Sequence, residues 1–270
     1  MATMARAKSK AAAEPVLRRA DAGGVATLTL NRPAARNALS VGLMGALQQA
    51  LTAIAKDRAI KAVIIGAEGP AFCAGHDLKE VRANPGRAAY EALFAQCSRL
   101  MQSIIALPQP VIAQVQGFAY AAGCQLVATC DLAVAADTAT FCTPGVNIGL
   151  FCSTPMVAAS RNLPRKKMME MLLLGDAIGA ADAQALGLVN RVVPPARLAA
   201  ETRAMAEAIA KKSPLVVKIG KEAFYRQLEM PLAEAYAYTS RVMTENMLAR
   251  DAEEGIDAFL QKREPKWEGR

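Results

Sequence analysis

The chain has 270 residues, of which 53% are hydrophobic, 5% are aromatic and 21% are charged. This composition suits one large domain with a full core, and it excludes both disorder of the bulk of the chain and a disulfide scaffold, since there are only six cysteines. The net charge of +8 is compatible with an anionic ligand, whereas the lack of a Lys/Arg run interleaved with aromatic residues disfavours nucleic acid.

The first residues, 1–14, predict a flexible basic tail that is rich in alanine and holds no acid before Glu14. The tail lacks the apolar stretch of a secretory signal. We therefore expect a cytoplasmic protein, with the mitochondrial matrix as the alternative if the tail is a presequence. Two uncharged stretches, 102–130 and 138–160, are interrupted by Pro, Gly, Gln or Asn, which favours buried strands and turns over membrane spans.

Strand and helix patterns alternate up to about residue 165, which predicts an α/β fold with helical crossovers. The expected strands are Val25–Leu30, Ala62–Ile65, Val111–Val115 and Leu132–Ala135. The expected helices are Gly42–Lys56, capped by Ser40, and then Ala88–Ile105 and Ala121–Cys130.

From Lys166 onward the pattern is almost entirely helical. The expected helices are Met168–Leu174, Ala181–Leu186, Arg197–Lys211, Pro214–Gln227, Leu232–Leu248 and Ala252–Lys262. We therefore divide the chain into the tail over 1–14, an α/β core over 15–200 and a helical C-terminal region over 201–270.

Two loops next to buried strands are candidates for the chemistry. One is Phe72–Leu78, and the other is Gly117–Gln125, where small residues join a strand to a helix. The first N–H groups of a helix have no partner within it and attract negative charge. The second loop therefore predicts one half of an oxyanion hole, and the first loop is placed to supply the other half; close helix packing alone is the alternative.

Several motifs, in the same order along the chain, resemble those of the crotonase superfamily, also called the enoyl-CoA hydratase/isomerase family. They are Asn31-Arg32-Pro33 with Asn37-Ala38-Leu39, Phe72–Leu78, Gly117–Cys124 and Ala180–Val193. Within the superfamily, residues 122–128, 143–147 and 149–155 are most similar to the group named enoyl-CoA hydratase domain-containing protein 3. The resemblance implies a crotonase-like ββα spiral core followed by an α-helical C-terminal trimerisation region, assembled as a homotrimer or a dimer of trimers.

The resemblance also implies an acyl-CoA substrate whose thioester carbonyl is polarised by two backbone N–H groups, those of His76 and Ala122. CoA would then enter only as part of the substrate, with no separate cofactor. The residues that match CoA-contacting positions of the family are Ala35, Arg36, Ala38, Ala74, Asp77 and Leu78, together with Phe259 and Lys262, which would reach the CoA of a neighbouring subunit.

The chain departs from the family at the residues that move protons. Hydratases of the family use two glutamates, and Gln125 and Gly145 occupy those positions here. An amide orients water but does not take a proton near neutral pH, so efficient hydration is not expected. Ser153 stands at a third position that holds a carboxylate in some members, and it has no base nearby in the sequence.

The cysteines show no metal-ligand spacing, and with a single histidine we expect no metal site. Near the pocket, Cys124 and Cys152 are expected to serve packing. Three hypotheses on function stay open. The protein is an acyl-CoA enzyme of the family type, a non-catalytic acyl-CoA-binding pseudoenzyme, or an acyl-CoA decarboxylase, hydrolase or isomerase that needs little help from protein acids or bases.

Overall fold

The computed structural model describes residues 14–270, so the predicted tail, apart from Glu14, lies outside the described residues. Six strands form a first sheet in the order β1-β2-β3-β5-β7-β10. They are β1 (Leu17–Ala22), β2 (Val25–Leu30), β3 (Ala62–Ala67), β5 (Val111–Val115), β7 (Leu132–Ala136) and β10 (Arg191–Val193). Every neighbouring pair is parallel except β1 with β2.

A second, smaller sheet has the order β4-β6-β8-β9. Its strands are β4 (Ala71–Cys73), β6 (Phe118–Tyr120), β8 (Thr140–Cys142) and β9 (Ile178–Gly179). The first three are parallel, so their carboxyl ends lie at one edge of the sheet. The loops that follow these three strands are therefore brought together.

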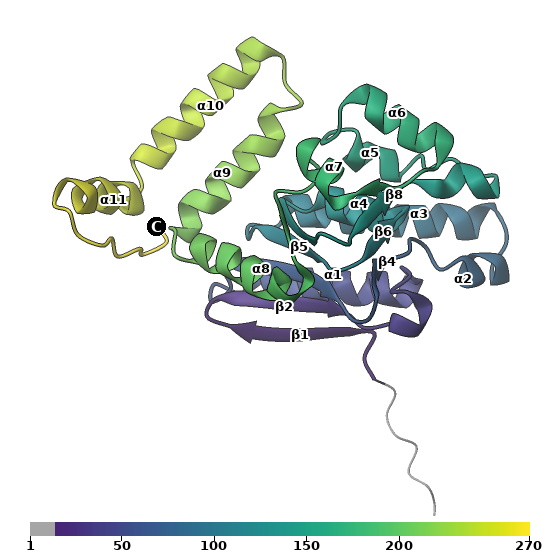
Figure 1. Cartoon of the computed structure of the whole chain (residues 1–270). Helices are drawn as coiled ribbons and strands as arrows, with labels where there is room; N and C mark the ends of the chain where they lie inside the picture. Colours follow the sequence, from purple (N-terminus) through teal and green to yellow (C-terminus); the bar gives the residue numbers. More distant parts are fainter. Residues whose placement is uncertain (1–13) are drawn as a thin grey trace, which may run out of the picture.

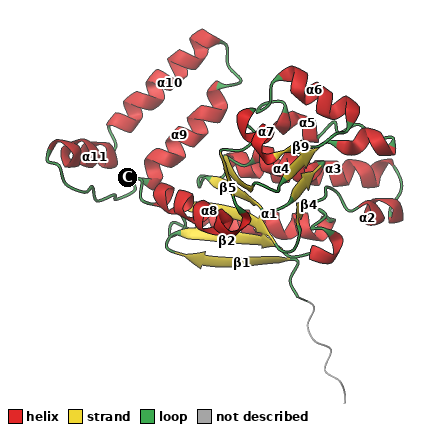
Figure 2. Ribbon diagram, viewed as in Figure 1, coloured by secondary structure: helices red, strands yellow, loops and turns green. Residues whose placement is uncertain are grey.

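Helices cover both sheets (Figures 1 and 2). In the core they are α1 (Val41–Lys56), α2 (Leu78–Ala83), α3 (Arg87–Ala106), α4 (Ala122–Thr129), α5 (Pro155–Ala159), α6 (Arg165–Leu174), α7 (Ala180–Ala185) and α8 (Pro195–Ala210), with 3-10 helices η1 (Pro33–Ala35) and η2 (Pro144–Ile148). The C-terminal region holds α9 (Pro214–Gln227), α10 (Leu232–Met247) and α11 (Arg250–Leu260).

The order of elements confirms the predicted ββα spiral. A strand of the first sheet leads to a strand of the second and then to a helix, as in β3-β4-α2 and β5-β6-α4. The main core includes Leu28, Phe72 and Phe141, each with no exposed surface. On the other face of the first sheet, α8 packs through Leu198, Met205 and neighbouring residues. The predicted domain boundary at residue 200 falls within α8.

The predicted helices and buried strands are present with small shifts at their ends. Ser40 caps α1 as predicted, because its hydroxyl accepts the Leu43 N–H at 3.1 Å. The strands absent from the prediction are β1, β4, β6, β8, β9 and β10. Most of these are three residues or fewer, too short for a hydrophobic period. No helix within residues 14–270 is both long and apolar enough to span a bilayer.

Helices α9, α10 and α11 stand away from the core in Figure 1. One buried polar cluster fastens α9 to the core. Lys221 is 7% exposed at its side chain and donates to Asp131 Oδ2 at 2.7 Å, to Ile104 O at 2.9 Å and to Gln109 O at 3.1 Å. The Tyr225 hydroxyl donates to the other oxygen of Asp131 at 2.9 Å. All three ammonium hydrogens of Lys221 are therefore used.

Candidate active site

The candidate site lies at the carboxyl edge of the small sheet. β4 leads into Ala74–His76, β6 into Ala121 and α4, and β8 into Thr143 and η2. A Cβ placed at Gly75 would lie 3.4 Å from the Ala122 nitrogen, so the first two segments are in contact. The structure therefore brings the two predicted loops together.

Backbone hydrogen bonds hold the His76 loop against the segment before α1. The Leu39 N–H donates to Gly75 O at 2.8 Å, and the Ala74 N–H donates to Arg36 O at 3.0 Å. His76 forms a parallel bridge with Leu39, and its own N–H has no acceptor among residues 14–270. The loop is thus fixed while one donor is left free.

Asn37 braces this arrangement and was not singled out by sequence reasoning as a functional residue. Its buried amide nitrogen donates to Glu68 O and Ala71 O, both at 2.8 Å, and its Oδ1 accepts the Arg32 N–H at 2.8 Å. Its φ of 53° lies in the left-handed region, which asparagine tolerates better than most residues. The Asn-Arg-Pro…Asn motif was the signal that pointed here.

Arg32 makes a second brace. Its guanidinium donates to Ala38 O at 2.6 Å and to Asp77 Oδ2 at 2.9 Å. Asp77 also caps α2 by accepting the N–H groups of Lys79 and Glu80. The hydrogen bond from Arg32 holds the pKa of Asp77 below its ordinary value, against the opposing effect of burial.

The second donor is at the start of α4. Ala121 has a φ of 49° and is tied by its N–H to Cys142 O at 2.9 Å, and this turn leads into the helix. Ala122 is the first helical residue, and its N–H has no acceptor in the described part of the chain. Gly123 allows α4 to approach β4, since a Cβ there would lie 2.2 Å from Cys73 O. The free N–H therefore stands at a positive helix end.

The His76 side chain is turned into the protein. Its ring packs edge-on against Phe94 of α3, with ring centroids 5.6 Å apart, and neither ring nitrogen has a hydrogen-bond partner in the part of the chain that the structure describes. Burial lowers the pKa of His76, although the Leu39 backbone and the Glu80 carboxylate act in the opposite direction. The imidazole is therefore neutral at pH 7.

The two predicted glutamate positions are both in this region and hold no carboxylate. Gln125, on α4, is 4% exposed, and its Oε1 accepts a weak hydrogen bond from the Cys97 thiol at 3.9 Å. Gly145 lies in η2, where a Cβ would be 2.9 Å from both Cys152 Sγ and Leu150 O. Position 145 therefore has no room for any side chain without a local shift.

Ser153 is exposed, and its hydroxyl makes only a 3.4 Å contact to Phe151 O. The nearby thiols are protonated at neutral pH, because burial raises the pKa of Cys124 to about 12 and that of Cys142 to about 11. Neither a serine nucleophile with a base nor a thiolate is present in this arrangement.

The other predicted CoA contacts fall into two groups. Ala35, Arg36 and Ala38 precede α1, and Ala74, Asp77 and Leu78 belong to the His76 loop and the start of α2. Arg36 and Leu78 are exposed, and the two segments are joined by the hydrogen bonds above. These six residues, called the rim below, lie in two hydrogen-bonded segments next to the His76 and Ala122 N–H groups.

Phe259 and Lys262 are not brought to that rim. Phe259 lies at the end of α11 and Lys262 lies two residues after it, and α11 lies across the molecule from β4 and β6 in Figure 1. Phe259 is 81% exposed. Within one chain they are remote from the site, so their predicted role depends on a second subunit.

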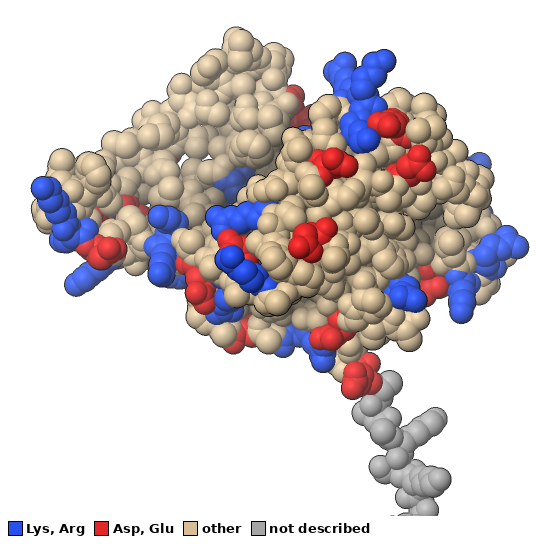
Figure 3. Space-filling model, in the orientation of Figure 1, with Lys and Arg blue, Asp and Glu red and all other residues tan. Residues whose placement is uncertain are grey.

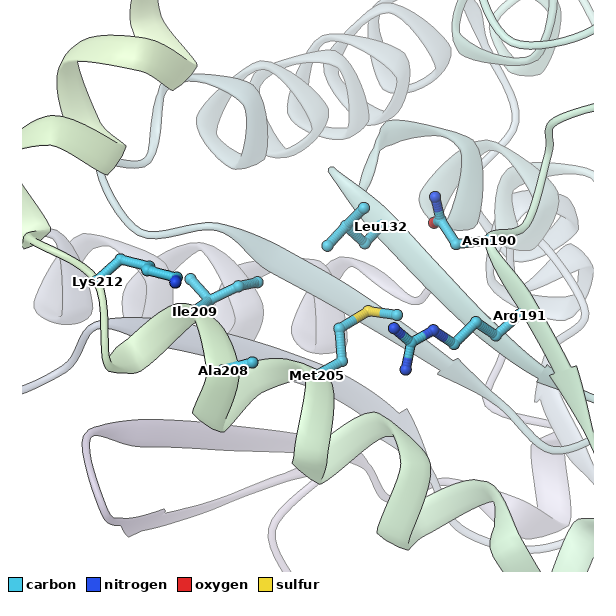
Figure 4. Close-up of a pocket in the computed structure, with 7 residues that line it drawn as sticks. All are labelled: Leu132, Asn190, Arg191, Met205, Ala208, Ile209 and Lys212. Carbon is cyan, nitrogen blue, oxygen red and sulfur yellow. The ribbon is translucent and has the colours of Figure 1, made fainter. Parts of the chain in front are cut away.

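One cavity lies beside the rim and another lies away from it. One of about 340 Å³ lies between α2 and α3, beside the rim, and is lined in part by Val81 and Leu93. The other, of about 390 Å³, lies between α8 and the first sheet, away from the two free N–H groups. Figure 4 shows Arg191 and Lys212 at its opposite ends. Across residues 14–270, no group of three or more His, Cys, Asp or Glu is placed to hold a metal.

Comparison with known proteins gives the family of the chain. The family model described as enoyl-CoA hydratase/isomerase matches residues 20–270. The chain belongs to the enoyl-CoA hydratase/isomerase family. The human protein named enoyl-CoA hydratase domain-containing protein 3, mitochondrial, is 50% identical over 244 residues, which cover 90% of this chain and 80% of that protein. This similarity agrees with the predicted subgroup.

Solved structures of the enoyl-CoA hydratase/isomerase family confirm the fold. A crystal structure titled enoyl-CoA hydratase from Mycobacterium smegmatis has a TM-score of 0.92 and 53% identity, covering 94% of this chain and 99% of that one. The crystal structure of human enoyl-CoA hydratase domain-containing protein 3 has a TM-score of 0.91 and 48% identity, covering 93% of this chain and 100% of that one.

Proposed function

We propose that this protein binds acyl-CoA thioesters and polarises the thioester carbonyl between the N–H groups of His76 and Ala122. The observation that carries the proposal is the pair of unbonded N–H groups in contacting segments, one of them at a helix N-terminus. Two such donors stabilise an oxyanion or a thioester enolate, and each contributes about 3 kcal/mol to lowering a barrier.

The reaction is one that needs no carboxylate from the protein. Gln125 has an amide in place of an acid, and position 145 has no space for a side chain. A malonyl-type thioester carries its own leaving group, because loss of CO₂ from C2 leaves the electron pair on the enolate held by the two N–H groups. Decarboxylation is therefore the candidate that the closed position at Gly145 favours; hydration is not.

Assembly into a homotrimer, or a dimer of such trimers, is part of the proposal. Large apolar side chains stay exposed on the C-terminal helices, among them Leu232 at 75%, Leu248 at 77% and Phe259 at 81%. Figure 3 shows few charged side chains over α9 and α10 on the face in view. A surface of this kind marks a protein contact. Assembly would also let Phe259 and Lys262 reach the CoA of a neighbour.

For location, we propose the mitochondrial alternative over the cytoplasm. The names of the relatives from human, Xenopus laevis and mouse describe those proteins as mitochondrial. Fractionation of cells that express the protein at its natural level tests this choice.

The experiment that tests the function is mass spectrometry of CoA thioesters incubated with the protein in D₂O. The set holds crotonyl-CoA, a 3-enoyl-CoA, a 2-alkylmalonyl-CoA and a saturated acyl-CoA. We expect loss of CO₂ from the malonyl type and no addition of water to crotonyl-CoA. Release of free CoA or migration of the double bond would name hydrolysis or isomerisation instead.

A binding measurement separates a pseudoenzyme from a protein that does not use acyl-CoA. A saturated acyl-CoA is compared with its thioether analogue, which lacks the carbonyl oxygen. Tighter binding of the thioester supports the oxyanion hole even without turnover. Equal binding of the two, or binding of neither, contradicts the proposal. Ala122→Val places a larger side chain at the proposed oxyanion hole and therefore crowds the site. Ala128→Val, at the other end of α4, is its matched control.

A further inference from the structure

The space at the second glutamate position is taken by a thiol. A Cβ at Gly145 would lie 2.9 Å from Cys152 Sγ, and the Gly145 backbone interacts with that sulfur. Cys152 is 7% exposed. The sulfur therefore stands within the volume that a side chain from position 145 would enter.

A second observation marks this place as a binding site for a polar group. The hydroxyl of Thr143, two residues before Gly145, is buried and has no hydrogen-bond partner within residues 14–270, and Thr143 has no exposed surface. Buried polar side-chain atoms are almost always bonded. Four such unbonded atoms occur among the described residues, and three of them, on Thr143 and His76, follow the ends of β8 and β4.

Four thiols lie near these strand ends, on Cys73, Cys124, Cys142 and Cys152. The geometry at Gly145 places the thiol of Cys152 in contact with a side chain at position 145. The Gln125 amide does not ionise in the ordinary range, and neither does the Thr143 hydroxyl. The His76 imidazole is neutral, because burial lowers its pKa. The Cys142 thiol already donates to Gly175 O at 3.1 Å. Cys152 keeps its proton at neutral pH, since burial raises its pKa.

We propose that the thiol of Cys152 replaces the second glutamate as the group that protonates the α-carbon of the thioester enolate. This rests on the proposed function, which supplies the enolate. In the full step, the C–C bond to the carboxylate breaks and CO₂ leaves. The electron pair of the broken bond stays on the thioester and forms the enolate. The enolate carbon then takes the proton from sulfur, and the resulting thiolate takes a proton from water.

The step is favourable because an enolate carbon is a much stronger base than a thiolate. A thiol fixed in the protein would deliver hydrogen to a single face of the α-carbon. Water held in an asymmetric site can also favour one face, so handedness in wild type alone does not name the donor. The donor is named by the change in handedness when the thiol is removed.

The test is turnover of a 2-alkylmalonyl-CoA in D₂O by wild type, Cys152→Ser, Cys152→Ala and Cys130→Ser. Serine keeps the shape of cysteine but is a far weaker acid. Cys130 is the matched control, because it is a buried thiol that is 8% exposed and lies at the other end of α4. Rate of CO₂ loss, handedness of the deuterated product and melting temperature are measured for each.

We expect wild type and Cys130→Ser to place deuterium on one face, and both Cys152 variants to give a mixture, with product formation about 10²-fold slower. Unchanged handedness in Cys152→Ser at normal turnover overturns the role of Cys152 and leaves the proposed function standing. A mixture of the two product hands from wild type also overturns the role of Cys152 and leaves the proposed function standing. An absence of turnover of every thioester by wild type overturns both.

Discussion

The two halves of the candidate site are built in different ways. After β4 and β6 the functional atoms are main-chain N–H groups, held by the Asn37 amide, the Arg32 guanidinium and the bridge to Leu39. After β8 the family places a side-chain carboxylate, and here Gly145 and the Cys152 sulfur fill that space. The proposed thioester contacts thus come from the main chain, whereas the residues in the space after β8 are set by the identity of two positions, 145 and 152.

The half of the site that follows β4 and β6, called the braced half, should tolerate substitutions less well than the half that follows β8. Asn37→Ala removes three hydrogen bonds from a buried site and places alanine at a positive φ. We expect a loss of about 3 kcal/mol in the free energy of unfolding, measured in urea, together with loss of acyl-CoA binding. Asn84→Ala, which removes one exposed hydrogen bond, is the control and should change stability by less than about 0.5 kcal/mol.

The half of the site that follows β8 should not accommodate a glutamate at position 145. Gly145→Glu is expected to cost about 2 kcal/mol of unfolding free energy, because its Cβ meets Cys152 Sγ and Leu150 O. Removing the sulfur in Gly145→Glu/Cys152→Ala should recover part of that loss. Urea unfolding of the three variants checks this, and equal stability of Gly145→Glu and wild type would show that the space is open.

The ion pair between Arg32 and Asp77 gives the braced half a pH dependence. The folded-state pKa of Asp77 lies below its ordinary value of 3.8. The ion pair therefore stabilises the fold fully above pH 3.8, and this stabilisation is lost as the pH falls through the folded-state pKa. Asp77→Asn keeps a helix cap but not the charge. We expect a difference from wild type of about 1 kcal/mol at pH 7 that vanishes in acid, and a constant difference would contradict it.

The third carboxylate position should be idle. Ser153→Ala removes an exposed hydroxyl with one long contact. We expect turnover within twofold of wild type, about 0.4 kcal/mol, and an unchanged melting temperature. A larger loss of turnover would move the chemistry from the main-chain donors to this serine.

The two loops of the site are predictable from the sequence because they adjoin long, apolar elements. The strands Val111–Val115 and Leu132–Ala136 are buried runs, and α1 carries its own cap at Ser40, so each is predictable from local pattern. The strands that align the loops are three residues long and exist only through pairing with distant strands. Their register is a property of the tertiary structure.

The closure at Gly145 is beyond sequence reasoning for a similar reason. The sequence shows only that glycine lacks the carboxylate, whereas in the fold Leu150 O and Cys152 Sγ lie where a side chain from position 145 would begin. The Lys221 cluster was missed as well, since Asp131 and Lys221 are 90 residues apart in the chain. Only the resemblance to the family placed the C-terminal residues Phe259 and Lys262 in a functional role, and that role stays a prediction.

The Lys221 cluster has a consequence for the surface that α9 presents. Because the ammonium group binds the end of α3, the loop at Gln109 and Asp131 at once, α9 is docked on the core of its own chain. If copies of this chain associate as proposed, each brings a surface that is already shaped, and we expect the rate of association to depend on concentration and not on further folding.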